Sequence, residues 1–122
     1  MAKRILIVDD EPNIVISLEF LMKREGFEVA VAGDGETALR LLAEQPTDLV
    51  LLDVMLPKKS GYEVCQAIRG NADWQATKII LLTAKGRETE MAKGMALGAD
   101  TYMTKPFSTK DLLTRVKQLL GT

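Results

Sequence analysis

The sequence contains no histidine, and it contains only one cysteine, Cys65, among its 122 residues. Without a histidine, no imidazole of this chain can act as a catalytic base or carry a phosphoryl group. A single cysteine cannot form an internal disulfide, and this favours a reducing compartment. Because Cys65 falls on an apolar helical face, we predict that it is a core residue.

Strong charge of one sign and long apolar runs are also absent. The 16 basic and 17 acidic residues give a formal net charge of −1, whereas a surface that binds nucleic acid duplexes is usually basic. No stretch approaches the ~20 apolar residues that a membrane span requires. The apolar run at residues 5–8 is far too short for the core of a signal peptide. We therefore expect a cytoplasmic protein that binds neither nucleic acid nor a membrane directly.

The composition that is present, 47% hydrophobic and 27% charged, is typical of a folded domain. It predicts a single domain over residues 1–122, with no output domain in this chain. Short apolar runs alternate five times with helical patterns, which predicts an α/β sandwich with helices on both faces of a parallel sheet. The expected strands are 4–8, 27–32, 48–52, 78–82 and 100–104, and the expected helices are 12–25, 36–44, 62–69, roughly 87–97, and a fifth that starts at Ser108.

Five side chains with useful chemistry fall at or just past the ends of four expected strands. They are Asp9 and Asp10, Asp53, Thr83 and Lys105. The carboxyl ends of parallel strands share one edge, where such sheets bind ligands. Three crowded carboxylates repel one another unless a cation holds them, and oxygen ligands suit Mg²⁺. Each residue alone has a plainer interpretation, such as a helix cap, a turn or a salt bridge, so the prediction depends on their joint placement.

Together these side chains predict a phosphoryl acceptor. Asp53 is the best candidate for the nucleophile, through an acyl phosphate. Asp10 and Asp53 could ligate Mg²⁺ directly, a backbone carbonyl just beyond the nucleophile could add a third oxygen, and Asp9 would act through a metal-bound water. Lys105 would place a positive charge beside a phosphoryl oxygen, and Thr83 would donate its hydroxyl.

Over essentially its whole length the chain resembles two-component response regulator receiver domains, the CheY-like superfamily. The matching stretches are ILIVDDEP at 5–12, DLVLLDVMLP at 48–57, SGYE at 60–63, LTA at 82–84, GAD at 98–100 and YMTKPF at 102–107. The resemblance implies a flavodoxin-like doubly wound (βα)5 fold with strand order 2-1-3-4-5. It also implies a signalling receiver, not an enzyme, that catalyses only its own phosphorylation and dephosphorylation.

The resemblance implies roles for individual residues as well. Asp53 would take a phosphoryl group from a phosphohistidine on a sensor histidine kinase or a histidine phosphotransfer protein. Mg²⁺, or Mn²⁺ as an alternative, would be bound by Asp10, Asp53 and the Met55 carbonyl, with Asp9 in support. Thr83 and Tyr102 would form a switch pair. The peptide bond before Pro106 would be cis.

The output of such a switch would be the face built from the fourth helix, the fifth strand and the fifth helix. An unknown downstream protein would bind there, and the chain would be a monomer or a weak dimer through the same face. Arg115 and Lys117 could serve as basic members of a dimer contact, but Thr101 and Ala96 stand where dimerising relatives often carry acids.

Several alternatives remain open from the sequence. The chain either stands alone and acts through protein contacts, which we favour, or was cut from a longer regulator. It could be a pseudo-receiver that is not phosphorylated and serves as a binding scaffold. A Mg²⁺-dependent phosphatase is a further alternative, although no second acid or base and no substrate cap is found. Met55 and Lys85 are expected to tune the lifetime of the phosphoryl group.

Overall fold

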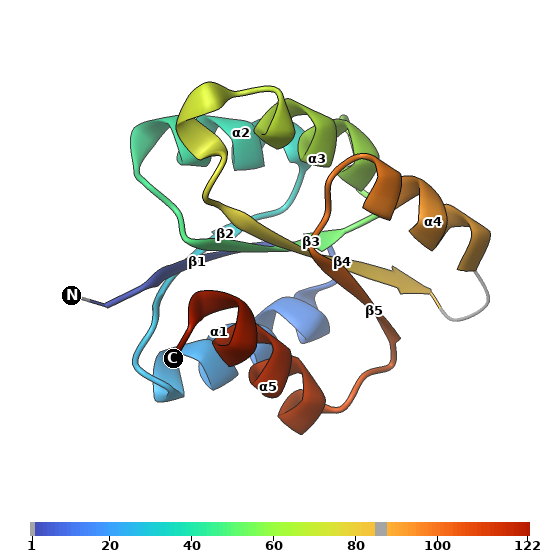
Figure 1. The fold of residues 1–122 in the computed structure, drawn as a ribbon. Coiled ribbons are helices and arrows are strands. Elements are labelled where there is room, and N and C mark those ends of the chain that lie inside the picture. Colours follow the sequence, from blue (N-terminus) through green and yellow to red (C-terminus); the bar gives the residue numbers. More distant parts are fainter. Residues whose placement is uncertain (1, 85–87) are drawn as a thin grey trace.

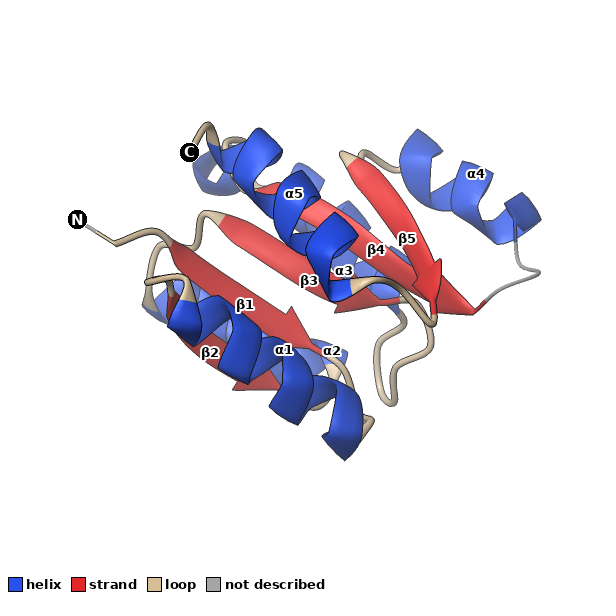
Figure 2. Cartoon of the chain, turned by 90° about the horizontal axis from the view of Figure 1, so that it is seen from below, coloured by secondary structure: helices blue, strands red, loops and turns tan. Residues whose placement is uncertain are grey.

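Five parallel strands form one sheet in the order β2-β1-β3-β4-β5. The computed structural model describes residues 2–84 and 88–122. The strands are β1 (Arg4–Val8), β2 (Glu28–Ala32), β3 (Leu49–Asp53), β4 (Lys78–Ala84) and β5 (Thr101–Lys105). Figure 2 shows the strand arrows pointing the same way, so the residues that end the strands meet at one edge of the sheet. The predicted sheet and its strand order are confirmed.

Helices cover both faces of the sheet. They are α1 (Pro12–Arg24), α2 (Gly35–Glu44), α3 (Gly61–Arg69), α4 (Glu88–Ala96) and α5 (Thr109–Leu120), with a short 3-10 helix at Ala72–Trp74. Helices α1 and α5 lie on one face, and α2, α3 and α4 lie on the other (Figure 1). This is the predicted three-layer sandwich. Among the described residues, no helix is long and apolar enough to cross a membrane.

Each face of the sheet has its own apolar core. In β3, Val50 and Leu52 pack in the core beneath α2 and α3, whereas Leu49 and Leu51 pack in the core beneath α1 and α5. This alternation follows from the two-residue repeat of a strand, and burial on both faces explains why β3 reads as an unbroken apolar run. Cys65 lies fully buried in the first core, as predicted, and burial raises the pKa of its thiol.

Local chemistry sets several helix ends. Pro12 is the first residue of α1, where its missing N–H is no loss. Gly26 has φ +90° just after α1, a conformation that glycine adopts readily. The Ser108 hydroxyl accepts the Asp111 N–H and caps α5, which begins at Thr109, one residue later than expected. A capping box between Ser60 and Glu63 starts α3 one residue earlier than we expected.

The predicted strand ends need three corrections. Strand β4 runs two residues further than expected, to Ala84, because it continues to pair with β5 through Thr83↔Thr104 and Ala84↔Lys105. Thr83 therefore lies inside a strand, and Asp53 and Lys105 are the last residues of their strands instead of following them.

The predicted starts of three strands were also one residue too early. Strands β3 and β5 begin after Asp48 and Asp100, whose side chains accept the N–H groups of Arg4 and Ile79, each at 2.8 Å. Side-chain hydrogen bonds of this kind compete with regular ladder pairing. Strand β2 begins at Glu28 and not at residue 27, and α2 begins at Gly35 and not at residue 36. The predicted start of the fourth helix at Arg87 lies outside the described residues.

Candidate functional site

Three carboxylates meet at the carboxyl edge of the sheet. One oxygen each from Asp9, Asp10 and Asp53 lies within 4.8 Å of the others. The topology brings them together because β1 and β3 are neighbours, with Val8 paired to Leu52. Asp9 and Asp53 are buried, whereas Asp10 is exposed, so the cluster opens to solvent on one side.

This donor set fits a hard divalent cation. All three ligands offer carboxylate oxygens, and Mg²⁺ binds through one or two such groups while it keeps several waters. Both oxygens of Asp9 are already engaged, because Oδ1 accepts the Glu11 N–H at 2.9 Å and Oδ2 accepts from Lys105 at 2.8 Å. Asp9 is therefore better suited to bind a metal-bound water than to ligate the metal directly.

The lysine at this edge reaches across to the acids. Lys105 Nζ lies 2.8 Å from Asp9 Oδ2, 3.0 Å from Glu11 Oε1 and 3.6 Å from Asp53 Oδ2. Burial would lower the pKa of this ammonium group, but its hydrogen bonds to Asp9 and Glu11 and the charges of Asp53 and Asp9 outweigh that effect and raise the pKa. Lys105 therefore stays charged across the physiological range.

For Asp53, in contrast, the surroundings disfavour the charged form. Burial raises its pKa from 3.8 to about 6, and the charges of Asp9 and Asp10 add to the rise. Lys105 and the Met55 N–H, which donates to Asp53 Oδ1 at 3.1 Å, act against it. Asp53 can thus ionise at neutral pH, but the ionised form is penalised, and a bound cation would relieve the penalty.

The Thr83 side chain adds an unsatisfied polar group. Thr83 is 1% exposed, and its Oγ1 is buried without a hydrogen-bond partner among the described residues. An unpaired buried hydroxyl destabilises a fold by about 1–3 kcal/mol. Most buried polar groups in proteins are paired, so this hydroxyl is available to a ligand oxygen at the strand edge.

The loop after β3 is packed directly against the Asp53 backbone. Gly61 N–H donates to the Val54 carbonyl at 3.0 Å. A Cβ at Gly61 would lie only 2.4 Å from the Asp53 carbonyl oxygen. Met55, next to the nucleophile, is 57% exposed. Close approach at Gly61 thus holds the segment that carries both Asp53 and Met55.

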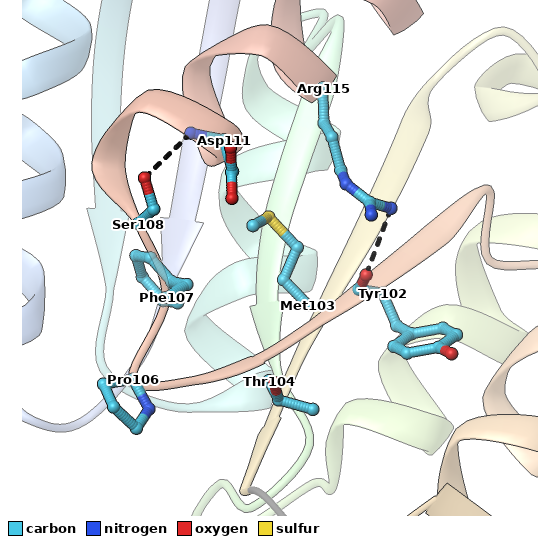
Figure 3. A pocket seen from close by; sticks show the side chains of 8 residues that line it. All are labelled: Tyr102, Met103, Thr104, Pro106, Phe107, Ser108, Asp111 and Arg115. Atoms are coloured by element: carbon cyan, nitrogen blue, oxygen red, sulfur yellow. Dashed lines mark hydrogen bonds between the residues drawn. The ribbon is translucent and has the colours of Figure 1, made fainter.

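The predicted switch residue Tyr102 lies apart from the acids, on β5. Its side chain is exposed, whereas the adjacent Met103 is buried. Figure 3 shows the Tyr102 ring pointing away from the Met103 side chain, beside a groove of about 260 Å³ between β5 and the start of α5. The peptide bond between Lys105 and Pro106, which follows β5, is cis.

The two basic residues suggested for a dimer contact already have partners within the chain. Arg115 donates to Thr101 Oγ1 at 2.7 Å and to the Tyr102 carbonyl at 3.5 Å (Figure 3). Lys117 pairs with Glu25 at 3.0 Å. A weak dimer through this face stays a prediction.

One site residue was missed by the sequence analysis. Glu11 stands directly after Asp10 and bonds Lys105, but we read it only as part of a matching stretch. A third consecutive acid at the start of a helix was the available signal. Lys85, expected to influence the lifetime of the phosphoryl group, lies outside the described residues.

The fold and the site together define a doubly wound α/β domain with an acidic pocket at the carboxyl edge of its sheet, beside a half-buried lysine. Residues 5–117 match the response regulator receiver domain family. The chain therefore belongs to this family of signalling modules from two-component systems.

Solved structures agree with this assignment. A putative response regulator from Chloroflexus aurantiacus J-10-fl is 34% identical, with a TM-score of 0.95 and both chains fully covered. The DrrB receiver domain activated with BeF3 is 38% identical, with a TM-score of 0.90 and full coverage of both chains. The receiver domain of a sensor histidine kinase from Pseudomonas aeruginosa PAO1, with magnesium in its active-site cleft, is 28% identical, with a TM-score of 0.90 and full coverage of both chains.

Proposed function

We propose that this chain is the phosphoacceptor of a two-component relay, with Asp53 as the residue that is phosphorylated. The proposal rests on the convergence of three carboxylates, a charged lysine and a threonine hydroxyl at one edge of the sheet; this hydroxyl has no hydrogen-bond partner within the described part of the chain. The donor would be a phosphohistidine on a sensor histidine kinase or a histidine phosphotransfer protein, because this chain has no histidine of its own.

The group transfer balances without a further reactant. An ionised Asp53 oxygen forms a bond to phosphorus, the P–N bond to the donor imidazole breaks, and the electron pair of that bond leaves with the imidazole. Asp10, Asp53 and the Met55 carbonyl would hold Mg²⁺, or Mn²⁺, with Asp9 in support through water. The metal would neutralise charge on the phosphoryl oxygens. Lys105 would bind one of these oxygens, and the Thr83 hydroxyl would donate to another.

The signal would follow from the added charge. A phosphoryl group brings roughly −1.5 to −2 charges to the strand edge. The Thr83 hydroxyl then gains a hydrogen bond to the phosphoryl group, and Tyr102 turns inward from its exposed position into the space that Thr83 vacates. The face formed by α4, β5 and α5 would change in consequence and bind a downstream protein.

Phosphorylation by a small donor tests this function. Acetyl phosphate with Mg²⁺ should add one phosphoryl group to the wild-type protein, measured by intact mass, and none to Asp53→Asn. Removal of Mg²⁺ with EDTA should prevent the addition. A wild-type protein that does not respond would contradict the proposal and favour a pseudo-receiver scaffold, and sustained turnover of a small phosphoester would favour a phosphatase.

A further inference from the structure

The lysine at the site is held by an acid to which the proposed reaction gives no role. Lys105 Nζ donates to Glu11 Oε1 at 3.0 Å in addition to Asp9 Oδ2 at 2.8 Å. The separation of 3.6 Å between Nζ and Asp53 Oδ2 is too long for a hydrogen bond. The ammonium group is thus drawn toward Asp9 and Glu11 and away from the nucleophile.

The backbone around Glu11 fixes this arrangement. Glu11 is the N-cap of α1, yet its side chain makes no capping hydrogen bond, although carboxylates are favourable at helix N-termini. The carboxylate reaches Lys105 instead, while the Glu11 N–H donates to Asp9 Oδ1 at 2.9 Å. Asp9, Glu11 and Lys105 therefore form a closed network of three hydrogen bonds.

A phosphoryl group on Asp53 would compete with this network. The lysine ammonium has three N–H donors, and two are directed to Asp9 and Glu11. Asp9 belongs to the carboxylate cluster, whereas Glu11 does not. Among the described residues, the Glu11 carboxylate thus contacts the site through Lys105, while the Glu11 backbone N–H bonds Asp9.

We propose that Glu11 is a positioning residue that retains Lys105 in the unphosphorylated arrangement and so opposes capture of a phosphoryl group on Asp53. The inference rests on the proposed function, since it assumes that Lys105 binds the phosphoryl group. The Glu11 side chain is 59% exposed, so solvent screens the contact. Loss of the contact should raise affinity for a phosphoryl mimic by roughly two- to fivefold, the size expected for a partly exposed ion pair.

Beryllofluoride, titrated at saturating Mg²⁺ and followed by amide NMR, measures this competition. Glu11→Asp keeps the charge but is one methylene too short for the contact, and Glu11→Gln keeps the length but loses the charge. Both should bind beryllofluoride about two- to fivefold more tightly than wild type, with unchanged Mg²⁺ affinity. Glu19→Gln is the matched control, because Glu19 lies on the same helix and pairs with Lys23, and its affinity should equal that of wild type.

The pattern across the variants decides the matter. A gain in Glu11→Gln without a gain in Glu11→Asp would mean simple charge repulsion and would overturn the proposal, as would no gain in either or a parallel shift in Mg²⁺ affinity. In a Lys105→Ala background, Glu11→Gln should produce no further gain, and an equal gain there would also overturn it. If the Lys105→Ala protein binds beryllofluoride too weakly to titrate, the affinity of Glu11→Asp alone tests the proposal. Failure of wild type to bind at all, with Asp53→Asn as the non-binding reference, would refute the proposed function instead.

Discussion

Asp53 is 5% exposed, and burial beside two other acids raises the pKa of its carboxyl to about 6. The same burial that prepares the residue for a cation and a phosphoryl group makes its charged form unfavourable when neither is bound. At the scale of single residues, the burial that suits Asp53 to bind a cation and a phosphoryl group therefore lowers the stability of the folded protein.

The first prediction concerns the pH dependence of this penalty. Asp53 in the unfolded chain releases its proton near its ordinary pKa of 3.8, and in the folded protein near 6. The folded state thus binds more protons in this window, so stability falls as pH rises through it and stays lower above it. Without Mg²⁺, Asp53→Asn should be more stable than wild type by about 1–3 kcal/mol at pH above about 6.

Urea denaturation across this pH range checks the prediction. The difference between Asp53→Asn and wild type should shrink toward zero as pH falls to about 4. Asp73→Asn is a control at an exposed acid in the short 3-10 helix and should match wild type throughout. An Asp53→Asn protein that is less stable than wild type at neutral pH would contradict the claim that the ionised Asp53 carboxyl destabilises the fold.

A second prediction concerns Lys105, whose side chain pairs with the fully buried carboxylate of Asp9. Lys105→Ala should fold but lose about 1–3 kcal/mol of stability, because a buried acceptor is left unpaired. It should also bind beryllofluoride without the full set of amide shifts along α4, β5 and α5. NMR spectra with and without the mimic measure this, and a wild-type response would show that the role given to Lys105 is wrong.

At the scale of elements, the loop between β3 and α3 couples the nucleophile to the helix layer. The capping box at Ser60 and Glu63 fixes the start of α3. The absence of a side chain at Gly61 allows the helix to approach the Asp53 carbonyl. The capping box and the close approach at Gly61 thus hold the loop between Asp53 and α3, and they determine where the Met55 backbone lies.

The third prediction tests the packing of Gly61 against the Asp53 carbonyl. In Gly61→Ala the new methyl group would meet the Asp53 carbonyl oxygen at 2.4 Å, so the loop must shift. Overpacking of this kind costs about 1–3 kcal/mol, and Mg²⁺ affinity should fall by roughly tenfold because two proposed ligands move. Isothermal titration with Mg²⁺ measures it. Gly33→Ala, where a Cβ has nothing within 4 Å, should bind Mg²⁺ like wild type.

At the scale of the whole molecule, occupancy of the acidic pocket should be visible as global stability. A ligand that binds only the folded state stabilises it by RT ln(1 + [L]/Kd), about 2.7 kcal/mol at one hundred times Kd. The three carboxylates come from two different strand ends of one cooperative sheet, so relief of their repulsion should stabilise the entire domain.

The fourth prediction follows from this linkage. Mg²⁺ at high concentration should raise the free energy of unfolding of wild type by about 2–3 kcal/mol at pH 7.5. The gain should be smaller in Asp10→Ala and should weaken below pH about 6 in wild type, because Asp53 then binds a proton instead. Thermal unfolding scans measure it. An Asp10→Ala protein stabilised as much as wild type would remove Asp10 from the proposed ligand set.

The sequence alone determined the alternation of strands and helices, the cover of helices on both faces of the sheet and the convergence of Asp9, Asp10 and Asp53, because these follow from local periodicity and from the geometry of parallel sheets. Only the tertiary structure decided the distribution of Lys105 among three acids, the burial of the Thr83 hydroxyl and the raised pKa of Asp53. Glu11 and Lys105 are 94 residues apart, and their contact depends on differences of a few tenths of an ångström in how distant strands and loops pack. Sequence patterns carry no information at that precision, since they record which face a residue takes and not how far it lies from its neighbours.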